Sequence, residues 1–242
     1  LVVIFLMIFI VACAPKQNAI ETENNLAIDE IVQEKEENNP LEPIKPQVSN
    51  PLNGLNMDKE YENQRPLAVM IENEYNSRPQ SGLNKADVVY EILTEGGITR
   101  FLALFLGNQC GEIGPVRSSR PYFLDYAMEY DSVYVHYGAS PQAYSDLKKL
   151  KIDAIDGIYD SVTFWRDKSR KAPHNAYTSS EKILNTSEKR GFLRAPVLKA
   201  WNFRESSLAQ GDTLKEFILT YTNNYKVTYK YNSDDNCYYR YI

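Results

Sequence analysis

The stretch "PYFLDYAMEYDSVYVHYGASPQAYSDLKKL", residues 121–150, predicts a helix, a buried strand and a second helix in direct succession. Proline opens each predicted helix, at a position where its missing N–H is not needed, and Ser140 is placed to cap the second helix. The apolar, β-branched run "SVYVHYG" between them is typical of a buried strand. This alternation of helix and strand indicates a layered α/β or α+β fold.

Three further segments extend this pattern. "RPLAVMIEN" (65–73) predicts another buried strand, and "ADVVYEILTEGGITRFLALFLG" (86–107) predicts two strands joined by a Glu-Gly-Gly turn. "TSSEKILNTSEKRG" (178–191) predicts a third helix, because Thr178 and Glu181 have the spacing of a capping box.

From Phe217 onward, apolar or aromatic residues alternate with polar ones over three short runs, as in a β-meander. The last run reaches the final residue, so we expect a fragment whose β-rich part is incomplete. The prediction is a mixed sheet with packed helices, followed by the beginning of a β-rich C-terminal part. Four parts are expected: a signal peptide with lipobox (1–13), a disordered acidic tether (14–60), an α/β domain (61–210) and the start of the β-rich part (211–242).

The chain begins "LVVIFLMIFIVACAPKQ", an apolar run too short to span a bilayer as a mature helix, and typical of a signal-peptide core. Its end, Ile10 to Cys13, resembles the lipobox of bacterial lipoproteins, in which the peptide is cut before the cysteine and the cysteine receives lipid. Two or more acyl chains would hold the protein stably at the membrane. The alternatives are a conventional cleaved signal and an uncleaved anchor. No Met or basic residue precedes Leu1, so we expect a clipped chain or a non-standard start codon.

Residues 14–60 are rich in Asn, Gln, Glu and Pro, with four Lys against ten Asp and Glu. Such a segment buries too little apolar surface to offset its ordering entropy, so we expect a flexible tether, with the compact domain beginning near Arg65. The chain carries a formal charge of −5. Without the tether the remainder is close to neutral, which argues against nucleic acid as a partner.

Two cysteines remain if Cys13 carries lipid. Cys110 and Cys237 could pair in an extracytoplasmic compartment. The interpretation that we favour is two buried thiols that pack as small hydrophobes. Neither has C-x-x-C spacing, so no metal or redox motif is predicted.

The stretch "GPVRSSRPYF" (114–123) places Arg117 and Arg120 beside a predicted helix N-terminus, where backbone N–H groups favour an anion. A guanidinium is costly to bury unpaired and matches carboxylate or phosphate with its planar fork. These two arginines are therefore candidate anion ligands. The alternative is structural ion pairs with nearby acids: Asp125, Asp131, Asp156 or Asp160.

A second stretch, "FWRDKSRKAPHNAYTS" (164–179), could supply another wall of the same site. It carries Arg166 and Arg170 together with Lys168 and Lys171. His174 follows in a proline-containing loop, where functional residues are common, and is the candidate general acid or base. The alternative is an ordinary solvated loop.

Other reactive side chains give weaker signals. His136 is a further candidate ligand, although its place on a buried strand favours a hydrogen-bonded core histidine. No metal site is predicted, because the two histidines lack an acidic partner at ligand spacing. Helix capping accounts for Ser119 better than nucleophilic catalysis does. Three glutamates are weak candidates for glycosidase carboxylates: Glu72, Glu91 and Glu95.

Three long stretches carry a family resemblance: "RPLAVMIENEYNSRPQSGLNKADVVYEILTEGGITRFLALF", "IGPVRSSRPYFLDYAMEYDSVYVHYGASPQAY" and "DGIYDSVTFWRDKSRKAPHNAYTS". In these the chain resembles the YerB-type bacterial lipoproteins, a family built around a domain of unknown function. The resemblance implies a secreted, lipid-anchored protein. It implies no activity, cofactor or catalytic residue.

Two functions are consistent with these patterns. The first is a lipoprotein on the extracytoplasmic face of the membrane that binds or scaffolds an anionic cell-wall component or an envelope protein. The second is a cell-wall enzyme acting on a phosphodiester or glycan, with arginines stabilising charge and His174 as acid or base. The first is favoured, because no complete nucleophile, base and orienting group is visible. No cofactor is predicted.

Overall fold

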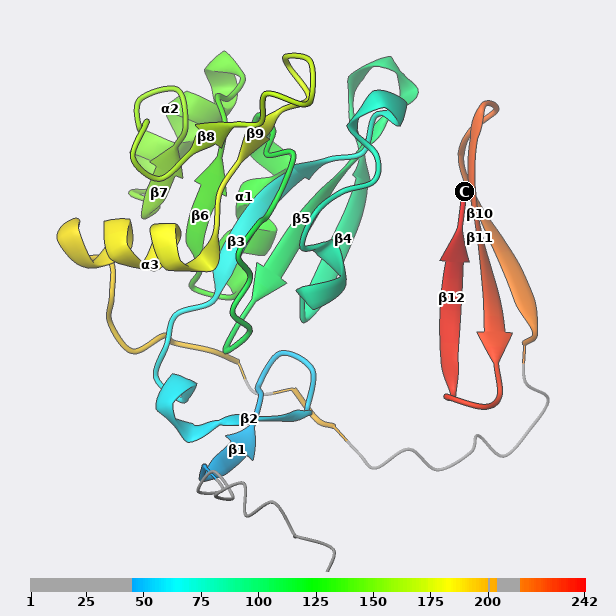
Figure 1. Ribbon diagram of the computed structural model, residues 1–242, viewed down its shortest axis with the longest axis horizontal. Coiled ribbons are helices and arrows are strands. Elements are labelled where there is room, and N and C mark those ends of the chain that lie inside the picture. Colours follow the sequence, from blue (N-terminus) through cyan, green and yellow to red (C-terminus); the bar gives the residue numbers. More distant parts are fainter. Residues whose placement is uncertain (1–44, 200, 204–213) are drawn as a thin grey trace, which may run out of the picture. The chain divides into compact units, whose positions relative to one another are not determined.

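The computed structural model describes residues 45–199, 201–203 and 214–242. A five-stranded mixed sheet runs through the main body in the order β4-β5-β3-β6-β7 (Figure 1). β3 pairs in parallel with β6 and β6 with β7, whereas β5 is antiparallel to both β3 and β4. The strands are β3 (Leu67–Glu72), β4 (Val88–Leu93), β5 (Thr99–Phe105), β6 (Val133–His136) and β7 (Ala154–Asp156).

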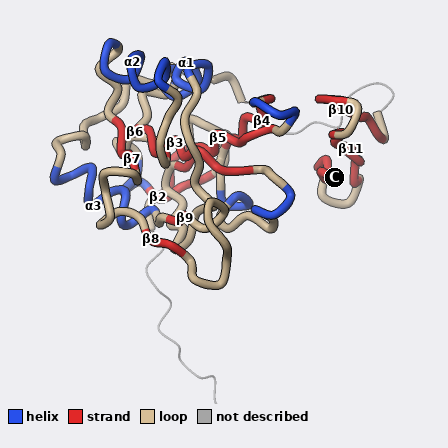
Figure 2. Tube along the Cα trace, turned by 90° about the horizontal axis from the view of Figure 1, so that it is seen from above, coloured by secondary structure: helices blue, strands red, loops and turns tan. Residues whose placement is uncertain are grey.

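Elements cover both faces of this sheet, and Figure 2 shows α1 and α2 on one side with α3, β8 and β9 on the other. Each side encloses its own apolar cluster. All six residues of β3 are buried, as expected for a central strand covered on both faces. The prediction of a mixed sheet with packed helices is therefore confirmed. The covering elements are α1 (Pro121–Glu129), α2 (Pro141–Lys149), α3 (Ser180–Lys189), β8 (Trp165–Arg166) and β9 (Ala176–Tyr177).

The helices begin close to the predicted positions. α1 and α2 both start at proline, and the Ser140 hydroxyl accepts a hydrogen bond from the Ala143 amide. Two caps differ from the prediction. Ser119 does not cap α1, because its hydroxyl accepts a hydrogen bond from the buried Tyr134 phenol. α3 is capped by Ser179, one residue after the predicted Thr178.

The predicted meander is present as a three-stranded antiparallel sheet, β10 (Glu216–Thr222), β11 (Tyr225–Asn232) and β12 (Cys237–Tyr241). One carboxylate links it to the edge strand of the main sheet. Glu91 on β4 accepts hydrogen bonds from the Arg240 guanidinium, the Tyr225 phenol and the Thr99 hydroxyl. Charge-assisted bonds of this kind are stronger than neutral ones, so Glu91 ties the two sheets together.

The folded part begins earlier than predicted. β1 (Gln47–Ser49) pairs with β2 (Asn56–Asp58). Leu52, in the connection between these strands, and Met57, on β2, are buried against the core. The predicted end of the tether at residue 60 is therefore wrong for residues 45–60. The rest of that prediction (14–44) and the lipobox at Cys13 lie outside the described residues. Within the described ranges there are also four short 3-10 helices: η1 (Lys59–Tyr61), η2 (Tyr75–Ser77), η3 (Leu83–Lys85) and η4 (Glu95–Gly97).

The two described cysteines are both free thiols. Cys110 is buried, and burial raises the pKa of its thiol. Cys237 is exposed on β12, so the expectation of two buried thiols is wrong for this residue.

Candidate functional site

The arginine-bearing segment around residues 116–119 lies where two strands of the sheet separate. β3 and β6 pair only as far as Val69 and Val135. Beyond that point Arg117 bridges them: its amide donates to the Met70 carbonyl and its own carbonyl accepts from the Tyr137 amide, both at 3.0 Å. The segment therefore sits at the carboxyl ends of the parallel strands, the edge at which open α/β sheets commonly bind ligands.

Glu72, the last residue of β3, is the centre of this edge. Its side chain is only 4% exposed. Arg117 Nε lies 2.9 Å from Glu72 Oε1, and His174 Nδ1 lies 3.0 Å from Glu72 Oε2. Arg117 Nε makes no hydrogen bond of normal geometry, so attraction between the two charges holds this contact. The two cation-rich stretches of the sequence therefore converge on one buried carboxylate.

A second carboxylate organises the neighbouring arginines. Arg120 Nε lies 2.5 Å from Glu95 Oε1, and this hydrogen bond is the main cause that lowers the pKa of Glu95. Arg100 lies 4.0 Å from the same carboxylate and donates to the Ser118 carbonyl. Burial, and then the positive charges of Arg120 and Arg117, lower the pKa of Arg100. The guanidinium group of Arg100 is thus close enough to those of Arg120 and Arg117 to be repelled by both.

Next to His174 the surface is hollowed over a volume of about 720 Å³, which we call the cationic hollow. Arg78 and Arg170 both line it. Arg78 donates to the side-chain and backbone oxygens of Asn73, and Arg170 donates to the carbonyls of Ser77 and Pro79. The full lining is Asn76, Arg78, Ser169, Arg170, Lys171, Ala172 and His174.

The charges of this hollow are poorly compensated. Among the ion pairs of the described residues, none involves Arg78, Arg170 or Lys171. Three acids lie nearby: His174 Nε2 is 3.7 Å from Glu74 Oε2 and its Nδ1 contacts Glu72, while the Asp167 carboxylate accepts hydrogen bonds from Ser169 and attracts Arg170. The hollow therefore offers positive charge to solvent or to a ligand.

The predicted site residues fall into three places. Arg117, Arg170 and His174 lie around Glu72 and the cationic hollow, whereas Arg120 is held by Glu95. Arg166 is elsewhere, 4.5 Å above the ring of Tyr137 and lining a different hollow.

His136 is a core residue, as its strand position favoured. Its Nδ1 lies 2.9 Å from the Gly138 carbonyl, and burial lowers its pKa. It lies next to Asp156, with Nδ1 3.9 Å from Oδ1. Nothing in this position brings it to the cationic hollow or to Glu72.

The prediction that Arg117 and Arg120 pair with one of four aspartates is wrong. The partners are glutamates on the neighbouring strand end and turn, Glu72 and Glu95, while Asp131 and Asp160 pair with other arginines. Strand ends meet in space but not in sequence, which is why sequence proximity misled. A third candidate carboxylate, Glu91, is likewise held by an arginine.

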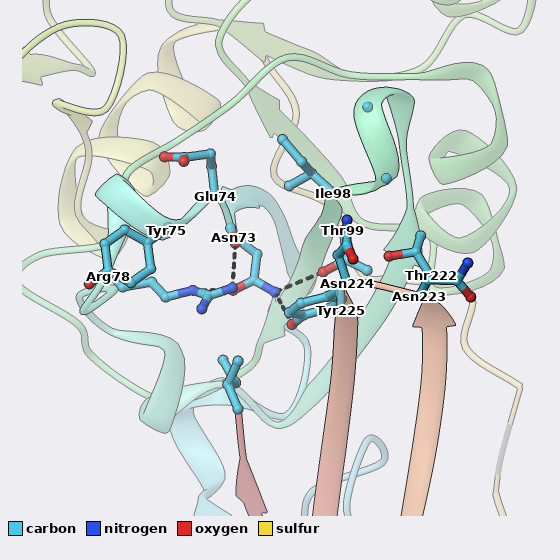
Figure 3. A pocket seen from close by; sticks show the side chains of 13 residues that line it. Asn73, Glu74, Tyr75, Arg78, Ile98, Thr99, Thr222, Asn223, Asn224 and Tyr225 are labelled. Atoms are coloured by element: carbon cyan, nitrogen blue, oxygen red, sulfur yellow. Dashed lines mark hydrogen bonds between the residues drawn. The ribbon is translucent and has the colours of Figure 1, made fainter.

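Arg78, Arg100 and Glu74 are site residues that the sequence patterns did not single out. One sequence signal could have pointed to Arg78. It stands in "SRPQ", which has the same Ser-Arg-Pro order as "SRPY" at residues 119–122, the stretch that contains the candidate ligand Arg120. Figure 3 shows Arg78 again in a neighbouring hollow of about 570 Å³, where Asn73 bonds to Arg78, Thr99 and Tyr225.

Two searches of the described residues found nothing. No group of three or more His, Cys, Asp or Glu side chains there could hold a metal ion. No helix of the described part is both long and apolar enough to cross a membrane.

Comparison with known proteins places this architecture in a family. Residues 52–193 match the family model described as "Protein of unknown function (DUF3048) N-terminal domain". The Bacillus subtilis (strain 168) protein named "Putative lipoprotein YerB" is 39% identical over 186 residues, which are 76% of this chain and 56% of that protein. A crystal structure of YerB from Bacillus subtilis matches with a TM-score of 0.73 and 37% identity, over 80% of this chain and 66% of the solved one. The chain thus spans little more than half the length of its curated relative, and it belongs to the DUF3048 family of YerB-type proteins.

Proposed function

We propose that this protein is a lipid-anchored module of the cell envelope that binds an anionic ligand at the cationic hollow. One observation carries the proposal: Arg78, Arg170 and Lys171 converge beside His174 without forming an ion pair among the described residues. Such groups are matched to phosphate or carboxylate oxygens.

The two arginines are held in place before any ligand arrives. Each uses part of its guanidinium on oxygens of the 73–79 segment, and each has five N–H donors in all. The remaining donors of Arg78 and Arg170 can bind an anion without further ordering of the side chains. Preorganisation of this kind lowers the entropy cost of binding.

The test is binding of inorganic phosphate, followed by calorimetry and by thermal stabilisation. We expect Arg170→Ala and Lys171→Ala each to weaken phosphate binding by about tenfold, the loss of one charge-assisted contact. Lys168→Ala is the matched control, since Lys168 is an exposed cation of the same loop that does not line the hollow, and it should change affinity by less than about twofold. Absence of phosphate binding by the parent, or an equal loss in all three variants, would overturn the proposal.

Catalysis retains one supporting observation, the 3.0 Å contact of His174 Nδ1 with Glu72, an arrangement that orients an imidazole as a general base. The same proteins should therefore be incubated with bis(p-nitrophenyl) phosphate. We expect no turnover. Hydrolysis by the parent that is lost in His174→Gln, with phosphate binding retained, would replace binding by phosphodiester cleavage as the function.

Lipid attachment at Cys13 is supported by the Ile-Val-Ala-Cys end of the apolar run and by the printed name of the Bacillus subtilis relative. Expressed from its native start, the parent should fractionate with membranes and carry the mass of a diacylglycerol. Cys13→Ala should appear in the soluble fraction without that mass, because no acyl chain would hold it. A variant that stays membrane-bound with unchanged acylation would contradict the anchor.

A further inference from the structure

A second hollow, of about 400 Å³, lies beside the carboxyl ends of β6 and β7. We call it the aromatic hollow, because its lining includes four rings and one arginine: Tyr137, Tyr159, Phe164, Trp165 and Arg166. A volume in this range is typical of small-molecule sites. None of the residues that line the cationic hollow lines this one.

Packing fixes three of the rings, and the fourth stands free at the rim. Tyr137 and Phe164 meet edge to face with centroids 5.7 Å apart, and Trp165 stacks on the buried Tyr177 at 6.2 Å. Tyr159, by contrast, is 80% exposed. A ligand that covered this exposed ring would remove apolar surface from contact with water, which is favourable.

Arg166 adds polar character to the same surface. Its guanidinium lies over the Tyr137 ring, and its Nη1 donates to the buried Asn175 side chain at 2.7 Å. None of the ion pairs of the described residues uses it. A flat cation with free N–H groups therefore borders the rings.

A single hairpin contributes residues to both hollows. Trp165 and Arg166 form β8, and the loop that follows them holds Arg170, Lys171 and His174 before the chain returns in β9. The Asn175 amide stiffens this loop by donating to the carbonyls of Asp167 and Arg170. Ring-binding and anion-binding surfaces are thus joined by one short, internally bonded segment.

We propose that the aromatic hollow binds a sugar ring of an anionic polysaccharide whose acid group occupies the cationic hollow. This rests on the proposed function and names its ligand class. A pyranose presents C–H groups on its faces, which suit aromatic rings, and hydroxyl groups at its edge, which accept from a guanidinium. The mixture of rings with Arg166 matches a sugar better than a lipid surface, which would favour an apolar lining alone.

Intrinsic fluorescence provides the test, because the full chain has only two tryptophans, Trp165 and Trp201. Trp201→Phe leaves Trp165 as the reporter, and Trp165→Phe leaves the exposed Trp201 as the matched control. Three probes separate the hollows: oligogalacturonate, a neutral galacto-oligosaccharide and inorganic phosphate. We expect oligogalacturonate to change the emission of Trp201→Phe and to leave Trp165→Phe unchanged, with weaker binding of the neutral sugar.

Tyr159→Ala removes a ring that packing does not need, so it keeps the test independent of folding. It should weaken oligogalacturonate binding by about tenfold and leave phosphate affinity unchanged. Tyr241→Ala, on β12, serves as its control and should change neither. Phosphate binding without any preference for oligogalacturonate would overturn this inference and leave the proposed function intact; failure of both probes would overturn both. Loss of binding to anionic phospholipid vesicles in Tyr159→Ala, with oligosaccharide binding unchanged, would assign the hollow to the membrane and overturn the inference.

Discussion

Replacing Arg65 by alanine is expected to lower the free energy of unfolding by about 3 to 5 kcal/mol, the cost typical of breaking a buried ion pair. The side chain is 3% exposed. It donates to the backbone and side chain of Asp131, to the Asp153 carboxylate, and to the carbonyls of Ser132 and Phe192. Alanine would deprive the carbonyl of the buried Ser132 of this donor and would remove one partner each from Asp131 and Asp153. The segments that precede β6 and β7 and that follow α3 would also lose the side chain that joins them.

The chain offers a matched control in Arg194, which pairs with the same Asp131 from the surface and is 50% exposed. Arg194→Ala should cost about 1 kcal/mol or less, since exposed ion pairs contribute little. Urea unfolding of both variants, extrapolated to water, measures the difference. Equal losses would mean that burial does not decide the strength of these pairs.

Arg117→Ala is expected to cost about 3 kcal/mol, because it strands the carboxylate of Glu72 in an environment where its side chain is almost fully buried. The His174 imidazole would remain in contact with this carboxylate, as Glu72 Oε2 lies 3.0 Å from its Nδ1. Reorganisation of the loop around His174 should follow, so phosphate binding in the cationic hollow should also weaken.

Arg120→Ala is the control for this substitution. Arg120 also pairs with a glutamate, but Glu95 is 62% exposed and can be solvated once its partner is gone, so the loss should stay near 1 kcal/mol. Urea unfolding and phosphate titration of both variants complete the comparison. A loss near 1 kcal/mol for Arg117→Ala, together with abolished phosphate binding, would make Arg117 a direct anion ligand in place of a structural one.

The elements of the fold were predictable because their signals are local. Proline at the first turn of α1 and α2, the Ser140 cap and the Glu-Gly-Gly turn between β4 and β5 each depend on neighbouring residues. The apolar run of β3 indicated burial on both faces. Where competing side chains were adjacent, as with Thr178 and Ser179, the prediction missed the cap by one residue.

The start of the folded part was missed for a related reason. Residues 45–60 are as polar in composition as the segment before them, so composition alone assigns them to the tether. Leu52 and Met57 nevertheless fill the core, and Asp87 accepts hydrogen bonds from the side chains of Asn50 and Asn53. Two buried apolar residues and two hydrogen-bonding asparagines are too few to change the average composition of the segment.

For the candidate site, the sequence by itself determined which residue types are present: two cation-rich stretches and a histidine, each beside a segment that packs into the core. Only the tertiary structure decided their partners. His174 and Glu72 are 102 residues apart in the chain, yet Nδ1 and Oε2 are 3.0 Å apart. The physical reason is range: caps and periodicity act over a few neighbouring residues, whereas an ion pair depends on ångström distances that exist only after β3, β6 and the β8–β9 hairpin have packed.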